Sequence, residues 1–317
     1  MTLHELDIIF FEGVPGSGKS TQAQWLEVNL IRQGHKARWY QEGDSQHPLN
    51  WWNVTPDFDW LPYLMDVENT MRHSRDKWRQ FTQRARQNNT LTLLEAWPFL
   101  NCVSIFVMAD ASEKALFDYW NDVRQMLAPL NAKLIYFDQP DLRTALMRIN
   151  SIRGDAWQKQ LYSTMERFPF CANRGLVGLD GVVTLWETHQ RIIRRMCDDF
   201  PGEIHRIDIT ANSWATNRSK LLGFLNIEAD NTPPPVLHSF TGTYASENCQ
   251  VTISQHHHNL ILREGDMETS LVWIGDNQFY YQAVPIICVF DPDGTLHIDS
   301  TRCGGETRIL NIVQNPL

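Results

Sequence analysis

Residues 7–21 constrain this chain more than any other stretch, because they join an apolar run to a glycine-rich turn and then to a helical pattern. Gly13, Gly18, Lys19 and Ser20 match the pattern G-x-x-x-x-G-K-[ST], in which successive backbone N–H groups curl around a phosphate. The following helix adds the positive end of its dipole. We therefore predict a nucleotide-binding loop made of Gly13, Val14, Pro15, Gly16, Ser17, Gly18, Lys19, Ser20 and Thr21.

The same spacing assigns roles to two side chains. Lys19 can reach the β- and γ-phosphates, and the hydroxyl of Ser20 can hold Mg²⁺. ATP and Mg²⁺ are therefore the predicted cofactors. The alternative interpretation is a glycine-rich strand-to-helix turn without a ligand, which the strand before the loop and the helix after it disfavour.

Size and charge limit the remaining function classes. A chain of 317 residues with 43% apolar content can bury a large core, and its length favours about two domains. A net charge of −9 argues against a broad face for nucleic acid or anionic membrane. A small anionic substrate remains compatible with it, because a local cationic pocket can form in an acidic protein.

The cysteine count and the apolar runs predict a cytoplasmic protein. The six cysteines form no C-x-x-C pair, which fits free thiols in a reducing compartment. The first residues do not resemble a signal peptide. The apolar run at residues 284–290 contains a proline and is too short to span a bilayer.

Apolar runs that alternate with helical patterns predict an α/β domain over residues 1–229, with a five-stranded parallel sheet flanked by helices. The expected strands are 7–12, 36–41, 91–95, 133–138 and 203–208, and helices are expected near 19–33, 58–88, 102–108, 113–127, 140–149, 182–200 and 214–225.

A change of composition follows this domain. Residues 230–235 end in three consecutive prolines and read as a stiff linker. Residues 236–317 contain short β-rich runs separated by regularly spaced turns. They predict a small antiparallel sandwich or barrel that dimerises the protein into a homodimer, covers the acceptor site or binds a ligand of its own.

Several segments together resemble the thymidylate kinase-like and deoxynucleoside kinase branch of the P-loop kinases. The resemblance covers about residues 5–228 and rests on Phe11-Glu-Gly13, Gly18-Lys-Ser-Thr-Gln22 and a second strand ending in Gln41-Glu42. It implies a phosphotransferase with an arginine-bearing lid after the fourth strand. Arg148 and Arg153 are the predicted lid arginines, because arginines that close over the transferred phosphoryl group stabilise its charge.

Two positions depart from the thymidylate kinase pattern. That family has an acidic residue inside the loop where this chain has Pro15. After the third strand it has Asp-Arg, where this chain has Glu95-Ala-Trp97. The missing arginine would grip the phosphate of a nucleotide acceptor, so a non-phosphorylated acceptor or an unusual metabolite is favoured.

Glu95 is the candidate catalytic or metal-organising carboxylate, because ligand groups gather at the carboxyl ends of parallel strands. The structural alternative is an exposed acid at a strand end. Trp97 flanks Glu95 and is assigned to the acceptor pocket, although tryptophan is usually a core residue. Asn212 follows the fifth strand, where related kinases bind the base, and is assigned to the nucleotide by position alone.

Three further acids are candidates for substrate binding. Glu12 immediately precedes the loop, and since a buried acid must be paired, support of a basic partner is its main expected role. Glu42 and Asp44 lie in the loop after the second strand and can bind polar groups of the acceptor. A solvated loop explains these two acids equally well.

The predicted function is an ATP- and Mg²⁺-dependent phosphotransferase acting on a small hydroxylated metabolite or a nucleoside-like acceptor. One alternative is a nucleoside monophosphate kinase that holds the acceptor phosphate with Arg72 or Arg75. Another is a nucleotide-binding regulatory ATPase module whose β domain binds a partner. A small-molecule acceptor is the expected partner, with no nucleic acid and no membrane.

Overall fold

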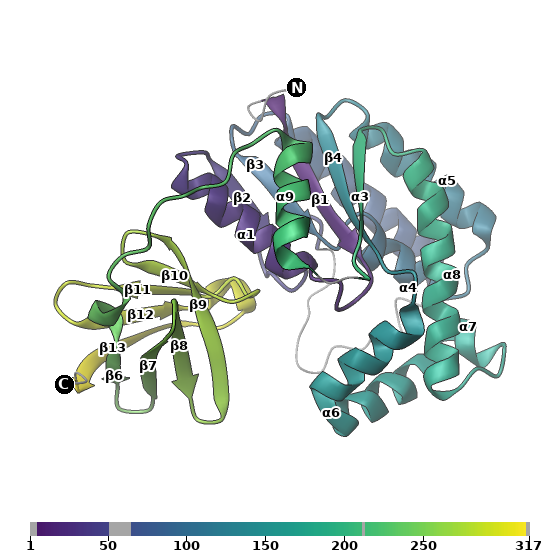
Figure 1. Cartoon of the computed structure of the whole chain (residues 1–317). Coiled ribbons are helices and arrows are strands. Elements are labelled where there is room, and N and C mark those ends of the chain that lie inside the picture. Colours follow the sequence, from purple (N-terminus) through teal and green to yellow (C-terminus); the bar gives the residue numbers. More distant parts are fainter. Residues whose placement is uncertain (1–4, 51–64, 211–212, 315–317) are drawn as a thin grey trace. The chain divides into compact units, whose positions relative to one another are not determined.

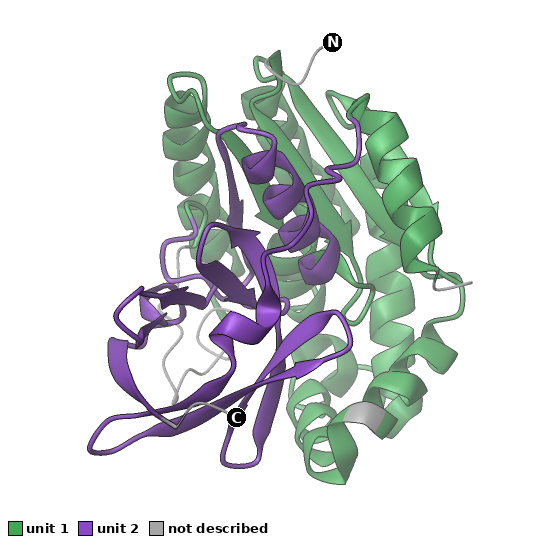
Figure 2. Cartoon of the chain, turned by 60° about the vertical axis from the view of Figure 1, so that its left-hand side comes forward, with its two compact units in different colours: residues 1–19, 48–227 green, residues 20–47, 228–317 purple. Residues whose placement is uncertain are grey.

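The computed structural model describes residues 5–50, 65–210 and 213–314. The chain forms two compact units, one of residues 1–19 and 48–227 and the other of residues 20–47 and 228–317 (Figure 2). The first unit holds most of the α/β region. The second unit combines the C-terminal strands with residues 20–47, which include most of the helix that follows the loop.

A five-stranded parallel sheet forms, as the sequence predicts (Figure 1). Its strand order is β2-β3-β1-β4-β5. Every residue of β1 and β3 is buried, which explains why these strands read as continuous apolar runs. Because β1 lies between β3 and β4, the loop that follows it leaves from the middle of the sheet edge. The strands are β1 (Ile8–Gly13), β2 (Ala37–Tyr40), β3 (Leu91–Glu95), β4 (Ala132–Asp138) and β5 (Glu203–Asp208).

Polar side chains cap the start of α3, α5 and α6. Asp66, Ser112 and Asp141 each accept a hydrogen bond from a backbone N–H three residues later. The predicted helix at 102–108 begins earlier than expected, as a π-helical turn η2 (Phe99–Val103) that continues into α4 (Ser104–Met108). The others are α1 (Lys19–Arg32), α3 (Val67–Ala85), α5 (Glu113–Leu127), α6 (Leu142–Glu166), α7 (Pro169–Ala172), α8 (Gly178–Asp198) and α9 (Trp214–Leu225).

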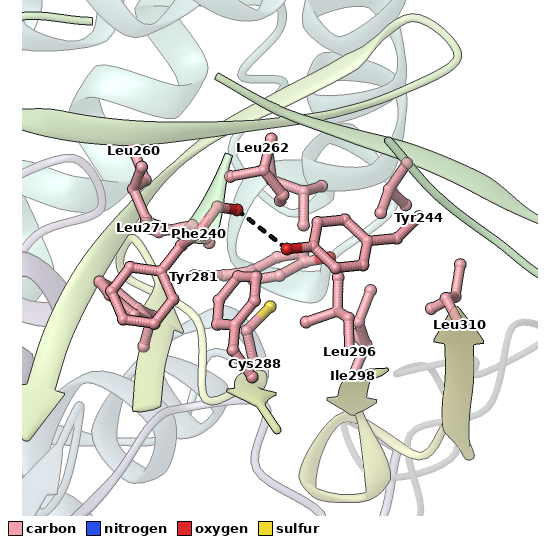
Figure 3. Packing of buried hydrophobic residues seen from close by; sticks show 14 residues of the cluster. Phe240, Tyr244, Leu260, Leu262, Leu271, Tyr281, Cys288, Leu296, Ile298 and Leu310 are labelled. Atoms are coloured by element: carbon pink, nitrogen blue, oxygen red, sulfur yellow. Dashed lines mark hydrogen bonds between the residues drawn. The ribbon is translucent and has the colours of Figure 1, made fainter. Parts of the chain in front are cut away.

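The C-terminal strands form a closed eight-stranded antiparallel barrel, one of the two β architectures expected. Its interior is filled by apolar side chains, and the hydroxyl of Tyr244 donates to the carbonyl of Phe240 at 3.1 Å (Figure 3). The strands are β6 (Gly242–Ala245), β7 (Gln250–His256), β8 (Asn259–Glu264), β9 (Met267–Gly275), β10 (Gln278–Tyr281), β11 (Ile287–Phe290), β12 (Thr295–Asp299) and β13 (Thr307–Gln314).

Within the second unit, polar contacts join α1 to the barrel and to the segment that precedes the barrel. The Gln24 amide donates to the carbonyl of Tyr281 at 2.8 Å and accepts from the backbone N–H of Ala283 at 2.8 Å. Arg32 pairs with Asp230 at 2.6 Å. These contacts tie the helix after the glycine-rich loop to the C-terminal part of the chain.

No helix in the described parts of the chain is both long enough and apolar enough to cross a membrane.

Candidate functional site

The loop between β1 and α1 has the backbone that phosphate binding requires. Gly13, Gly16 and Gly18 have φ values of 147°, 75° and 89°, so the chain turns through conformations that side chains with a Cβ rarely adopt. The N–H of Ser17 closes the turn on the carbonyl of Val14 at 3.2 Å. The loop therefore folds back tightly between the strand and the helix.

Neighbouring elements press directly on this loop. A Cβ atom on Gly13 would lie 2.7 Å from the carbonyl oxygen of Phe137, at the end of β4. A Cβ on Gly18 would lie 2.4 Å from the Cη2 atom of Trp214, at the start of α9. The glycines are therefore needed for close packing as well as for backbone conformation.

Lys19 points back into the loop rather than into solvent. The residue is only 4% exposed, and its Nζ donates to the carbonyl oxygen of Val14 at 3.2 Å. The hydroxyl oxygen of Ser17 is buried and has no hydrogen-bond partner among the described residues. A buried ammonium and a buried unsatisfied hydroxyl at the same turn are suited to the oxygens of an anion.

Glu12 is bonded to backbone groups. Its carboxylate accepts from the N–H of Phe99 at 2.6 Å and from the N–H of Leu100 at 3.2 Å, and so holds the start of η2. Burial raises the pKa of Glu12 to about 8, although these hydrogen bonds and the charge of Lys19 lower it. The sequence predicts the pairing of this acid but not its partners, because η2 lies 87 residues further along the chain.

Glu95 and Trp97 lie at the carboxyl end of β3. Glu95 pairs with Phe11 in the register of β3 and β1, and Phe11 immediately precedes Glu12. Glu95 is 2% exposed and Trp97 is 1% exposed, so neither is a solvated loop residue. Glu95 therefore lies at the same sheet edge as the start of the loop.

The two predicted lid arginines lie on α6, and both are exposed. Arg153 stacks on the ring of Trp157 at 4.8 Å, and the next residue, Gly154, has a φ of 83° that divides α6 into two helical segments. Ile149 follows Arg148 and packs against Gly16. The first segment of α6 is thereby fixed to the loop.

The other predicted site residues have different surroundings. Glu42 is exposed, whereas Asp44 is fully buried in the second unit and pairs with Arg302 at 2.7 Å. Ser20 and Thr21 occupy the first turn of α1. Asn212 lies outside the described residues.

Sequence reasoning missed three residues near the loop, because none carries a spacing signal. Ile149 and Trp214 contact loop glycines. His189, on α8, is buried, and burial together with the charge of Lys19 lowers its pKa to about 3, so its imidazole is neutral.

Arg72 and Arg75, the alternative ligands for an acceptor phosphate, line an open groove of about 690 Å³ between α3 and α5. Arg75 is paired with Asp122 at 2.6 Å, and three further acids, Asp66, Glu68 and Asp118, line the same groove. The carboxylates oppose the binding of an anion there.

Metal binding at the loop depends on oxygen ligands. The described part of the chain contains no group of three or more His, Cys, Asp or Glu residues that could hold a metal ion. Mg²⁺ needs no such group, because it commonly takes one or two protein oxygens and completes its shell with phosphates and waters. Hydroxyl and carboxylate oxygens are ligands of this kind, and the sequence predicts this role for Ser20 and Glu95.

Comparison with known proteins gives only distant likenesses. No family model and no curated protein matches the chain. Among solved structures, deoxyadenosine kinase from M. mycoides with bound dATP has a TM-score of 0.39 at 14% identity, covering 69% of this chain and 99% of that one.

Two other structures show similar likeness. The YorR protein of Bacillus subtilis, in complex with phosphorylated GDP, has a TM-score of 0.35 at 11% identity, covering 69% of this chain and 95% of that one. EHV4-TK complexed with TP4A has a TM-score of 0.31 at 12% identity, covering 71% and 92%. At such values we base no functional conclusion on these likenesses.

Proposed function

We propose that this chain is an ATP- and Mg²⁺-dependent phosphotransferase that acts on a small hydroxylated metabolite or a nucleoside-like acceptor. The observation that carries the proposal is the loop between β1 and α1. It combines backbone turns at Gly13, Gly16 and Gly18 with the inward-pointing ammonium of Lys19 and the buried hydroxyl of Ser17. Such a turn offers several donors to a polyphosphate at one point.

The proposed roles follow from this arrangement. Lys19 exchanges its bond to the Val14 carbonyl for oxygens of the β- and γ-phosphates, and Ser20 supplies a hydroxyl to Mg²⁺. Glu95 accepts the proton of the acceptor hydroxyl or orients a Mg²⁺-bound water. Arg148 and Arg153 close over the transferred phosphoryl group and stabilise its charge.

The proposal is tested by measuring ADP release from Mg·ATP across a panel of nucleosides, nucleotides and other hydroxylated metabolites. We expect slow release without an acceptor and a large increase with one class of acceptor. Lys19→Met should abolish the increase, whereas Lys114→Met, which removes an exposed lysine, should retain it. If wild-type protein neither binds ATP nor releases ADP with any acceptor, the proposal is wrong.

The role of Glu95 has a separate test, once an acceptor is found. Glu95→Gln keeps the size of the side chain but removes its basicity. Acceptor-dependent turnover should fall about 100-fold or more, while the Kd for ATP should change little. Undiminished turnover would exclude Glu95 as the catalytic carboxylate.

A further inference from the structure

The indole of Trp214 lies directly on the glycine-rich loop. Its Cη2 and Cζ3 atoms would be 2.4 Å and 2.7 Å from a Cβ atom on Gly18. Only a glycine at position 18 therefore leaves room for the ring. Gly18 immediately precedes Lys19, so the aromatic ring borders the part of the loop that would bind phosphate.

Trp214 is also exposed to solvent, unlike the buried tryptophans of this chain. Its exposed fraction is 39%, whereas Trp39, Trp78 and Trp97 are each 1% exposed or less. Among the exposed large hydrophobic side chains of the described residues, it is the only aromatic one. An exposed indole beside the loop offers a flat apolar face on which a planar ligand can stack.

We propose that Trp214 is the platform on which the base of the donor nucleotide stacks. This inference rests on the proposed function and adds the recognition of the base to it. In a nucleotide, the base is joined to the phosphates through a single ribose, so a base-binding surface must border the phosphate loop. Every nucleobase has a π-face, so stacking on an indole tolerates different bases.

If Trp214 stacks on the base, its loss should affect the Kd values of two triphosphate ligands differently. ATP offers a base to Trp214, and inorganic tripolyphosphate does not. Loss of the indole should therefore weaken the binding of ATP alone. The expected loss is about 10- to 100-fold in Kd, which is the range that base–aromatic stacking gives on alanine substitution.

The experiment is a calorimetric titration of the full chain, with Mg²⁺ present, by ATP and separately by inorganic tripolyphosphate. Trp214→Ala should lose affinity for ATP and keep its affinity for tripolyphosphate, and Trp214→Phe should stay within about threefold of wild type for both ligands. Trp273→Ala, which removes a partly buried tryptophan from β9, should bind both ligands as wild type does.

The outcomes separate the two proposals. Equal losses for both ligands in Trp214→Ala would mean that the ring only supports the loop, and an unchanged affinity for ATP would mean that it does not meet the base. Either result overturns the platform while leaving the phosphotransferase proposal in place. Wild-type protein that binds neither ligand would overturn the proposed function and the platform with it.

Discussion

Ile149 packs so closely on Gly16 that a Cβ atom on Gly16 would lie 2.5 Å from Ile149 Cδ1. Ile149 is 7% exposed and belongs to α6, the helix that carries Arg148 and Arg153. One apolar contact thus connects the glycine-rich loop to the arginine-bearing helix. The contact supports the loop at a glycine whose φ of 75° alanine would adopt only with strain.

Gly16→Ala should lower both stability and nucleotide affinity. The added methyl group overpacks against Ile149, at a typical cost of about 1–3 kcal/mol, and alanine is strained at a φ of 75°. Urea unfolding and ATP titration measure the two effects. Gly223→Ala, within α9 and with open space around it, is the matched control and should be neutral or slightly stabilising. Wild-type values for Gly16→Ala would contradict the close packing.

Glu12 should make stability depend on pH. Its pKa is about 8 in the folded protein against an ordinary value of 4.5, so the folded state binds a proton more tightly than the unfolded chain does. The resulting stability is fully present below pH 4.5, declines as pH rises and is lost above pH 8, with a slope of up to about 1.4 kcal/mol per unit.

Glu12→Gln should flatten this dependence, because the amide oxygen still accepts a hydrogen bond but does not titrate. Urea unfolding measured at intervals between pH 4.5 and 8.5 would show the change. Glu27→Gln offers a comparison, because burial raises the pKa of Glu27 to about 7. The stability that depends on protonated Glu27 should be lost above pH 7, at lower pH than the part that depends on Glu12. An unchanged slope in Glu12→Gln would show that this carboxyl titrates normally.

Breaking the buried pair between Asp44 and Arg302 should be costly. Arg302→Met leaves the Asp44 carboxylate buried without its charged partner, and such changes typically cost about 3–5 kcal/mol of unfolding free energy. Urea unfolding followed by fluorescence measures the loss. The control is Arg263→Met, which breaks an exposed pair with Glu268 and should cost about 1 kcal/mol or less. Equal, small losses would contradict the burial of the first pair.

Replacing Gln24 even by glutamate, which has nearly the same shape, should lower the stability of the protein. Gln24→Glu keeps the acceptor for the Ala283 N–H but places a carboxylate oxygen against the Tyr281 carbonyl, so it should destabilise at least as much as Gln24→Ala. An unsatisfied buried group costs about 1–3 kcal/mol, and thermal unfolding should show the loss. Gln33→Ala removes an exposed hydrogen bond to Glu228 and should change the Tm little. A Tm for Gln24→Glu equal to wild type would be contrary evidence.

The fold was predictable where local pattern and topology agree. The apolar strands and the helical patterns between them have clear signals in the sequence. Strands that alternate with helices form a parallel sheet. The closure of the C-terminal strands into a barrel, rather than a sandwich, depends on the pairing of β9 with β10 and of β13 with β6. Turn spacing alone does not determine such pairings.

Site residues were predictable only where a motif fixes them. Lys19 is identified by its spacing from the glycines, but the partners of Glu12 and Asp44 lie 87 and 258 residues away in the sequence. Trp214 reaches the loop from a helix whose sequence gives no sign of it. Contacts between distant segments are set by tertiary packing, and one sequence without its relatives does not reveal them.

The shared unit formed by α1 and the barrel has an evolutionary consequence. Gln24, Asn29 and Arg32 project from α1 to backbone and carboxylate groups of residues 228–283. Gln24 contacts the barrel, and Asn29 and Arg32 contact the segment that precedes it. Loss or exchange of residues 228–317 would therefore expose polar groups on the helix that follows the glycine-rich loop. Selection on that helix acts on two faces at once, and we expect α1 and the barrel to change together among descendants of this chain.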